Sequence, residues 1–173
     1  MEDATDSEPS GGPPRGPALR GDELLMRRML FKNKQYNPKF KPPILAGTFH
    51  PRKSDRDGLS MSRRHSETFP DFLTAEQMKA ACAVQSSRDR AECGVCAVGV
   101  ASVRAIGLTI TSSPTGTDPG HAHLEQINYD DFEGTDATDE SFARVVVWVQ
   151  QLVLLGCEHI LIVPGPAPGK EPV

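Results

Sequence analysis

The sequence lacks both an export signal at its N-terminus and a long uninterrupted apolar run. A secretory signal joins a basic stretch to an apolar segment and a small-residue cleavage site, and the first residues show no such order. The most apolar window, residues 145–155, contains two glutamines and is much shorter than the roughly 20 residues that span a bilayer. We therefore expect a cytoplasmic protein that has no membrane segment and keeps this window in its core.

Cysteine and aromatic residues are scarce, with four Cys and 6% Phe, Trp and Tyr in 173 residues. In an intracellular chain, the cysteines are expected to be reduced thiols rather than a disulfide framework. Cys93 and Cys96 match the C-x-x-C pattern, but the second pair of a structural zinc site is missing. We therefore predict buried core cysteines. Few aromatic residues lie among the basic ones, which argues against stacking on single-stranded nucleic acid.

Two familiar motifs are present only in part. Residues 53–64 match the middle of a calcium-binding loop, but Lys53 and Arg64 occupy the first and last ligand positions, which rejects an EF-hand. Residues 58–62 begin like the G-x-S-x-G turn of serine hydrolases but end with Ser62 instead of glycine. No motif in the sequence therefore fixes a reaction.

Charge is distributed very unevenly along the chain. Residues 21–66 contain eleven basic and four acidic residues, a balance of +7, whereas residues 67–173 contain six basic and fifteen acidic residues, a balance of −9. The first twenty residues add two basic and four acidic residues, which returns the net charge of −4. Such asymmetry favours a surface that binds phosphate, nucleic acid or an acidic protein.

Six arginines of the basic segment are candidates for phosphate or partner binding, because a guanidinium group can bind two phosphate oxygens at once. They are Arg27, Arg28, Arg52, Arg56, Arg63 and Arg64. The alternative is a solvated basic surface that balances the acidic half of the chain, since runs of charge are usually solvated.

The two ends of the chain differ in composition from its middle. Residues 1–20 contain acids, Ser, Gly and Pro with almost nothing to bury, and residues 164–173 repeat Pro and Gly. We expect both to be disordered tails, because ordering them would cost backbone entropy without burying apolar surface. The remaining residues, 21–163, are expected to form a single domain.

Apolar patterns predict several short strands. They lie at residues 44–49, 59–62, 93–100, 108–111, 121–128 and 157–163. Residues 23–31 fit a strand or a helix, residues 101–106 fit a short helix or a bend, and the acidic run 129–140 is expected to be a flexible loop.

Two main helices are predicted from their start signals. A Thr-x-x-Gln capping box at Thr74 precedes an apolar run that predicts a helix over residues 75–84. Thr138 or Asp139 can cap a second helix, which Gly156 would end in the left-handed conformation. Middle strands joined by turns favour an α+β fold, in which the two helices cover a small mixed sheet.

His121 and His123 form the best candidate chemical site. Residues two apart in a strand project from the same face, so the two imidazoles could hold a divalent metal or act as general acid and base. Candidates for a third metal ligand are His50, His65, Asp118 and Glu125. The alternative is a polar strand edge that follows a Pro-Gly turn.

The order of four segments within residues 24–128 resembles that of a group of small bacterial proteins that have no assigned activity. The segments are RRM, DRDGLS, GVASVRAIGLTI and PGHAHL. The resemblance carries no catalytic roles, but it implies that residues 57–60 and His121 belong to one structural site. The candidates for catalytic residues are Asp57, Ser60, His121 and His123.

Two functions are compatible with these features. The first is a protein-interaction module whose basic N-terminal face binds an acidic partner. The second is a small enzyme that acts on a nucleotide or nucleic acid, with the arginines on phosphate and with His121 and His123 as metal ligands or as acid and base. The interaction module ranks slightly higher, because no complete catalytic constellation can be written from the sequence.

Overall fold

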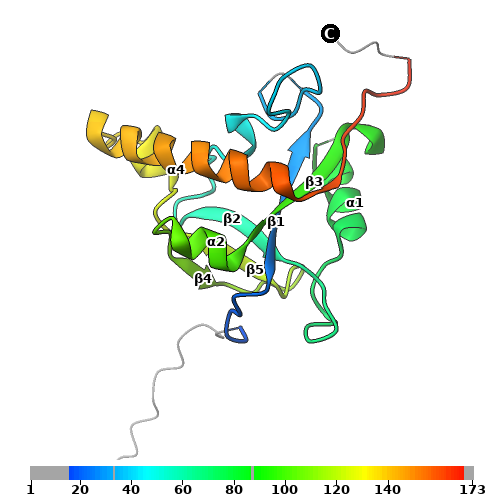
Figure 1. The fold of residues 1–173 in the computed structure, drawn as a ribbon, viewed down its shortest axis with the longest axis horizontal. Coiled ribbons are helices and arrows are strands. Elements are labelled where there is room, and N and C mark those ends of the chain that lie inside the picture. The colour runs from blue at the N-terminus through cyan, green and yellow to red at the C-terminus, as the bar shows by residue number, and fades with distance from the viewer. Residues whose placement is uncertain (1–15, 33, 87, 170–173) are drawn as a thin grey trace, which may run out of the picture.

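The computed structural model describes residues 16–32, 34–86 and 88–169. Within them, six strands form one sheet in the order β4-β5-β2-β1-β3-β6, and neighbouring strands are antiparallel throughout (Figure 1). The strands are β1 (Leu24–Leu30), β2 (Leu59–Arg63), β3 (Cys93–Gly99), β4 (Ile110–Ser112), β5 (His121–Leu124) and β6 (Ile160–Ile162).

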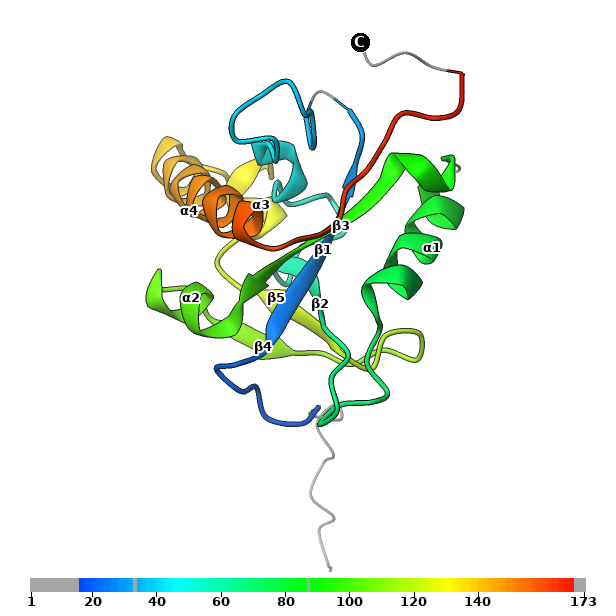
Figure 2. The same cartoon turned by 45° about the vertical axis from the view of Figure 1, so that its right-hand side comes forward.

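Two long helices lie on opposite faces of this sheet (Figure 2). The α-helices among the described residues are α1 (Ala75–Ser86), α2 (Val100–Ala105), α3 (Tyr129–Phe132) and α4 (Asp139–Glu158), and the 3-10 helices are η1 (Ala46–Thr48) and η2 (Arg90–Glu92). A sheet with two long helices of this kind confirms the α+β class predicted from the sequence.

The face of the sheet beneath α4 holds the main core. Val145, Val149 and Leu152 follow helical spacing and are at most 1% exposed. They belong to one cluster with alternate residues of the strands, such as Leu25 and Leu124. By length and composition α4 could also cross a membrane, and 33% of that stretch is buried in this structure. The buried stripe of α4 faces the sheet and closes the core on this side.

The opposite face of the sheet holds a smaller core beneath α1. Met26 and Val95 of the strands pack with Met78 of α1 in one cluster. The helix begins as predicted, because Thr74 and Gln77 each accept a hydrogen bond from the other's backbone N–H. Its main contacts are with β1, β3 and β6, so the part of this face over β2 and β5 extends beyond the helix.

Several strand predictions are confirmed, and others need new boundaries. The strands predicted at 59–62 and 93–100 are present as β2 and β3, and residues 23–31 form the strand β1. The predicted strand 121–128 is shortened to β5, and the one at 108–111 is shifted to β4. The backbone leaves β5 at Leu124, where the carbonyl oxygen accepts a hydrogen bond from the N–H of Ile127 in a turn.

The strand predicted at residues 44–49 is wrong. The middle of this segment forms η1 and passes so close to Lys34 that a Cβ on Gly47 would lie 2.0 Å from the Lys34 carbonyl oxygen. The hydroxyl of Thr48 donates to the carbonyl oxygen of Gln35 at 2.8 Å. Close packing against the preceding turn, which the apolar pattern does not reveal, therefore sets this conformation.

The flexible loop expected at residues 129–140 is also wrong. Asn128 accepts a hydrogen bond from the N–H of Asp131 and caps α3, and Thr138 accepts one from the N–H of Ser141 and caps α4. Acidic residues in the first turn of each helix lie at the positive end of the helix dipole, so they favour helical structure here.

Gly156 does not end α4, which continues to Glu158. A Cβ on Gly156 would lie 3.1 Å from the ring of Phe49, a contact tighter than ordinary packing. The glycine therefore allows the helix to approach the Phe49 ring closely, and it does not serve as the left-handed stop that the sequence suggested.

Parts of both expected tails make ordered contacts. The ranges 1–15 and 170–173 lie outside the described residues. The carbonyl oxygens of Pro17 and Ala18 accept hydrogen bonds from the guanidinium group of Arg63 at 2.5 and 3.1 Å. On the other side, the N–H of Gly165 donates to the carbonyl oxygen of Ala91 at 2.6 Å. Ordered contacts thus continue beyond both boundaries of the predicted domain, 21–163.

Candidate functional site

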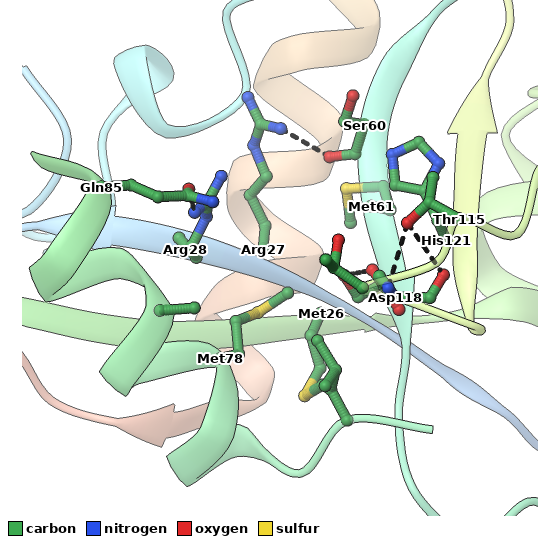
Figure 3. A pocket seen from close by; sticks show the side chains of 14 residues that line it. Met26, Arg27, Arg28, Ser60, Met61, Met78, Gln85, Thr115, Asp118 and His121 are labelled. Atoms are coloured by element: carbon green, nitrogen blue, oxygen red, sulfur yellow. Dashed lines mark hydrogen bonds between the residues drawn. The ribbon is translucent and has the colours of Figure 1, made fainter. Parts of the chain in front are cut away.

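A cavity of about 320 Å³ lies on the α1 face of the sheet, beside the helix (Figure 3). We call it the α1 pocket. Its polar lining includes Arg28, Ser60, Ser62, Asp118 and His121, and its apolar lining includes Met26, Leu73 and Met78. This volume is at the lower end of the range of small-molecule sites, about 300–1,000 Å³.

Alternation along the strands brings these polar residues together. Ser62 lies opposite His121 in the pairing of β2 with β5, and Ser60 lies opposite His123. On the other side of β2, Ser62 lies opposite Met26 of β1. Residues two apart point to the same face, so the serines and histidines share the face that α1 only partly covers.

The two histidines are fixed in orientation by backbone carbonyl groups. Nδ1 of His121 lies 3.0 Å from the carbonyl oxygen of Ser113, and Nδ1 of His123 lies 3.2 Å from that of Gly58. A carbonyl oxygen only accepts, so the neutral ring of each histidine carries its proton on Nδ1 and keeps a lone pair on Nε2. The ring centroids are 4.7 Å apart, with the rings edge to face.

The two serines are oriented by carboxylates. The hydroxyl of Ser60 donates to Asp55 at 2.8 Å, and the hydroxyl of Ser62 donates to Asp118 at 2.5 Å. Because a hydroxyl has only one proton, each serine oxygen can then offer only lone pairs to a ligand.

Asp118 is held in place by a tight turn just before β5. Its carboxylate also accepts a hydrogen bond from the N–H of Gly120 at 3.1 Å, and its own N–H donates to the hydroxyl of Thr115. None of the ion pairs among the described residues includes Asp118. The pocket therefore contains a half-buried carboxylate with no cationic partner in the described part of the chain.

Arg28 lies at the opposite end of the pocket from Asp118. Its guanidinium group donates to the side-chain oxygen of Gln85 in α1, and the two side chains lie together in Figure 3. The ion pairs of the described residues do not include Arg28 either. Most of its five N–H donors thus have no protein partner in the described ranges.

Arg27 also lines the α1 pocket, but protein groups hold its guanidinium group. Its guanidinium group donates to the carbonyl oxygens of Thr48 and Ser60 at 3.1 and 2.5 Å, and it lies 3.9 Å from the carboxylate of Asp55. Burial lowers the pKa of Arg27 to about 10, and the nearby carboxylate of Asp55 opposes that shift. The group stays charged at neutral pH and joins β1 to β2 beyond Met26, the last residue of β1 that pairs with β2.

Arg63 was expected on a phosphate-binding surface, and the structure corrects this prediction. The side chain is fully buried and pairs with the carboxylate of Glu23 at 2.7 Å. The rings of Phe69 and Phe72 each have their centroid 4.7 Å from its guanidinium carbon. An arginine enclosed in this way is a structural residue with no surface to offer a ligand.

The other three candidate arginines are exposed but lie outside the α1 pocket. Arg52 and Arg56 are in the loop before β2, whereas Arg64 follows β2 at its other end. Arg64 lines a smaller hollow of about 190 Å³ together with Arg20 and His65. The six arginines therefore do not form one face.

Asp55, rather than Asp57, is the acid that the fold places beside the site. Asp57 is exposed on a turn, where Gly58 has a φ of +126° and packs against the Leu124 carbonyl group. Asp55 is 3% exposed and accepts hydrogen bonds from both the N–H and the hydroxyl of Ser60. The density of polar residues around the Asp-Gly turn was the sequence signal for this loop, but it did not distinguish the two acids.

A metal site at the histidines lacks a third protein ligand among the described residues, which contain no group of three His, Cys, Asp or Glu suited to an ion. Of the proposed third ligands, only Asp118 lines the same pocket as His121. His50 packs on the ring of Phe132, and His65 faces the carbonyl oxygen of Pro70. Glu125 accepts a hydrogen bond from the hydroxyl of Thr111.

The sequence resemblance implied that residues 57–60 and His121 share one site. In the structure, Gly58 contacts His123 through its carbonyl oxygen, and Ser60 lies opposite His123 in the sheet. His121 is two residue pairs away, opposite Ser62. No protein-family model matches the chain, and comparisons with curated proteins and with solved structures give no match.

Proposed function

We propose that the protein binds a small molecule that carries a phosphate group, and that Arg28 holds this phosphate at one end of the α1 pocket. The supporting observation is a half-buried guanidinium group that lines a cavity and has no carboxylate partner among the described residues. Arginine binds phosphate through two parallel N–H donors, which gives both affinity and orientation. Gln85 fixes the guanidinium group from α1 and leaves other donors available.

Titration of ethyl phosphate, butyl phosphate and adenosine monophosphate into the full chain tests this proposal, with calorimetry as the measurement. Arg28→Gln should weaken binding about 10- to 100-fold, because hydrogen bonds to charged groups contribute about 1.5–3 kcal/mol. Butyrate serves as the carboxylate counterpart of the phosphates and should bind more weakly, since it carries less charge.

Arg56→Gln is the matched control, because Arg56 is an exposed arginine outside the pocket. It should bind the phosphates as the wild type does. The proposal fails if none of the three phosphates binds, or if Arg28→Gln and Arg56→Gln have the same effect.

A reaction at the end of the ligand remote from its phosphate is a second function that this geometry favours, because His121 lies beside Asp118 and Arg28 lies at the other end of the pocket. The observation is the lone pair on Nε2 of His121, which the Ser113 carbonyl group fixes by holding the ring proton on Nδ1. In this proposal, His121 is the general base. This proposal predicts that the wild type turns over the phosphate esters and that His121→Asn abolishes turnover. Binding through Arg28 should persist in the variant. Binding without turnover would restrict the pocket to a binding role.

Docking of an acidic protein on the basic loop is a separate proposal. Arg52, Lys53 and Arg56 are exposed, and none of the ion pairs in the described ranges includes them. Replacing all three by Gln should abolish binding to a polyglutamate peptide, and salt should weaken the wild-type complex steeply. A complex that is insensitive to salt would contradict this proposal.

A further inference from the structure

The Asp118 end of the α1 pocket presents mainly hydrogen-bond acceptors. The hydroxyl protons of Ser60 and Ser62 are already donated to carboxylates, so their oxygens can only accept. The neutral ring of His121 presents Nε2 as a lone pair, because Nδ1 faces the Ser113 carbonyl group. A ligand group that supplies N–H or O–H donors therefore matches these acceptors.

This end of the pocket also carries a negative charge that no ion pair of the described residues compensates. Asp118 accepts hydrogen bonds from Ser62 and from the N–H of Gly120, but both partners are neutral. Each carboxylate oxygen has a second lone pair beyond these bonds. A half-buried carboxylate favours a cation as its next partner, since a charged pair in a partly desolvated site is stronger than in water.

The wall between the two ends is apolar. Met26 is fully buried, Met78 is 6% exposed, and both line the pocket together with Leu73. Figure 3 shows the two methionines between Arg28 at one end and Asp118 at the other. Flexible thioether side chains pack well against methylene groups and offer no strong hydrogen bond to a sugar hydroxyl.

From these three features we infer that the ligand of the α1 pocket is amphoteric: a primary ammonium group at Asp118 is joined by a short alkyl chain to the phosphate at Arg28. This inference rests on the proposed phosphate-binding function and adds the class of ligand. The ammonium group supplies three N–H donors, which match the acceptors of Asp118, Ser62 and His121. The alkyl chain packs on the methionines.

The sheet sets the distance that the alkyl chain must span. Arg28 is in β1 and His121 in β5, with β2 between them. Neighbouring strands are about 4.8 Å apart, and His121 lies level with Met26, two residues from Arg28, so the backbones at Arg28 and His121 are separated by about 12 Å. Because the side chains at both ends extend into the pocket, a chain of a few carbons can join the two groups.

Calorimetry with a series of ω-aminoalkyl phosphates tests the inference. The alkyl chains have two to five carbons, and the affinity of each compound is compared with that of the alkyl phosphate of the same length. The best aminoalkyl phosphate should bind the wild type at least ten-fold more tightly than its amine-free counterpart, as expected for charge-assisted hydrogen bonds. Asp118→Asn keeps the shape and one of the two acceptor oxygens but removes the charge. It should erase most of this preference and retain binding of the alkyl phosphates.

Phosphocholine provides a second test on the unaltered protein. Its trimethylammonium group keeps the positive charge of phosphoethanolamine but has no N–H donor, so it should bind at least ten-fold more weakly than the two-carbon amine. This comparison also decides the matter should Asp118→Asn fail to fold.

The failure of this inference differs from the failure of the proposed function. Equal binding of aminoalkyl and alkyl phosphates, both weakened by Arg28→Gln, would overturn the ammonium site and leave the phosphate site intact. The absence of binding by every phosphate in the series would overturn both. The inference is contradicted if Asp118→Asn still prefers aminoalkyl phosphates and phosphocholine binds as tightly as phosphoethanolamine. That result would assign the preference for an amine to a different part of the protein.

Discussion

The two faces of the sheet are built from the same strands but differ in their cover. α4 places twenty residues over one face, whereas α1 places twelve over the other. The cluster beneath α4 contains most of the buried apolar residues, and the cluster beneath α1 is small. Where α1 ends its contact with the sheet, the face continues as the lining of the α1 pocket.

Alternation of side chains along β2 and β5 explains how one sheet can pack a core on one face and line a polar pocket on the other. Met61 and Leu124 point into the core beneath α4, whereas their neighbours Ser62 and His123 point to the other face. The core thus uses only every second residue of these strands. The comparison teaches that the remaining positions can hold polar side chains without loss of packing, provided that no helix covers them.

Arg63 and Arg28 provide the sharpest comparison between an enclosed and an open charge. Arg63→Met should destabilise the protein by about 3–5 kcal/mol, because it leaves the carboxylate of Glu23 buried without its partner. Arg28→Met should change stability by less than about 0.5 kcal/mol, since its side chain is only half-buried and has no ion pair in the described part of the chain.

Urea unfolding of both variants measures this difference in the free energy of unfolding. Similar losses for the two variants would show that Arg28 is a structural residue. That result would remove the basis for treating its guanidinium group as available to a ligand.

Leu152 and Leu154 test the α4 face itself, because they are the same residue type on one helix. Leu152 is fully buried and Leu154 is 62% exposed. Leu152→Ala should cost about 2–5 kcal/mol through lost burial and the cavity that remains. Leu154→Ala should stay within about 0.5 kcal/mol. Equal costs, measured by urea unfolding, would mean that the exposed side of α4 is covered by something else in solution.

Local patterns predicted much of the fold. The capping box at Thr74, the alternating residues of β2 and the continuous apolar run of β3 depend only on neighbours in sequence, and all three were interpreted correctly. The shared face of His121 and His123 follows from the same alternation. These features need no knowledge of which strands pair.

Which residues line the candidate site depends instead on contacts between segments that are distant in the sequence. The sequence could not show that Arg63 would meet Glu23, forty residues earlier, or that Arg28 and His121 would line one cavity. Charge counts treat all arginines alike, whereas the register between β1 and β2 decides which of them is enclosed. The basic segment was therefore recognised, but its division into structural and available arginines was not.

His50 is a half-buried titratable group, and it should make the stability of the protein depend on pH. Burial lowers its pKa below the usual value, an effect that the carboxylate of Glu133 opposes. The unfolded chain then takes up a proton first as the pH falls, so stability should decrease from about pH 6.5, the ordinary pKa, down to the folded-state pKa. His50→Gln should lose less stability than the wild type between pH 7 and pH 5 in urea unfolding. An unchanged loss in the variant would contradict this assignment.

The cysteines give the smallest and most local test of which regions are enclosed. Burial raises the pKa of the Cys96 thiol to about 12, three units above its ordinary value of 9.0, so its thiolate fraction at pH 8 falls about 1,000-fold. Cys157, near the end of α4, is only half-buried. Because the thiolate is the reactive form, a disulfide reagent should label Cys157 first in the native protein. Cys157→Ser should remove this fast phase and Cys96→Ser should leave it unchanged, whereas fast native labelling of Cys96 would show that the core beneath α4 opens readily.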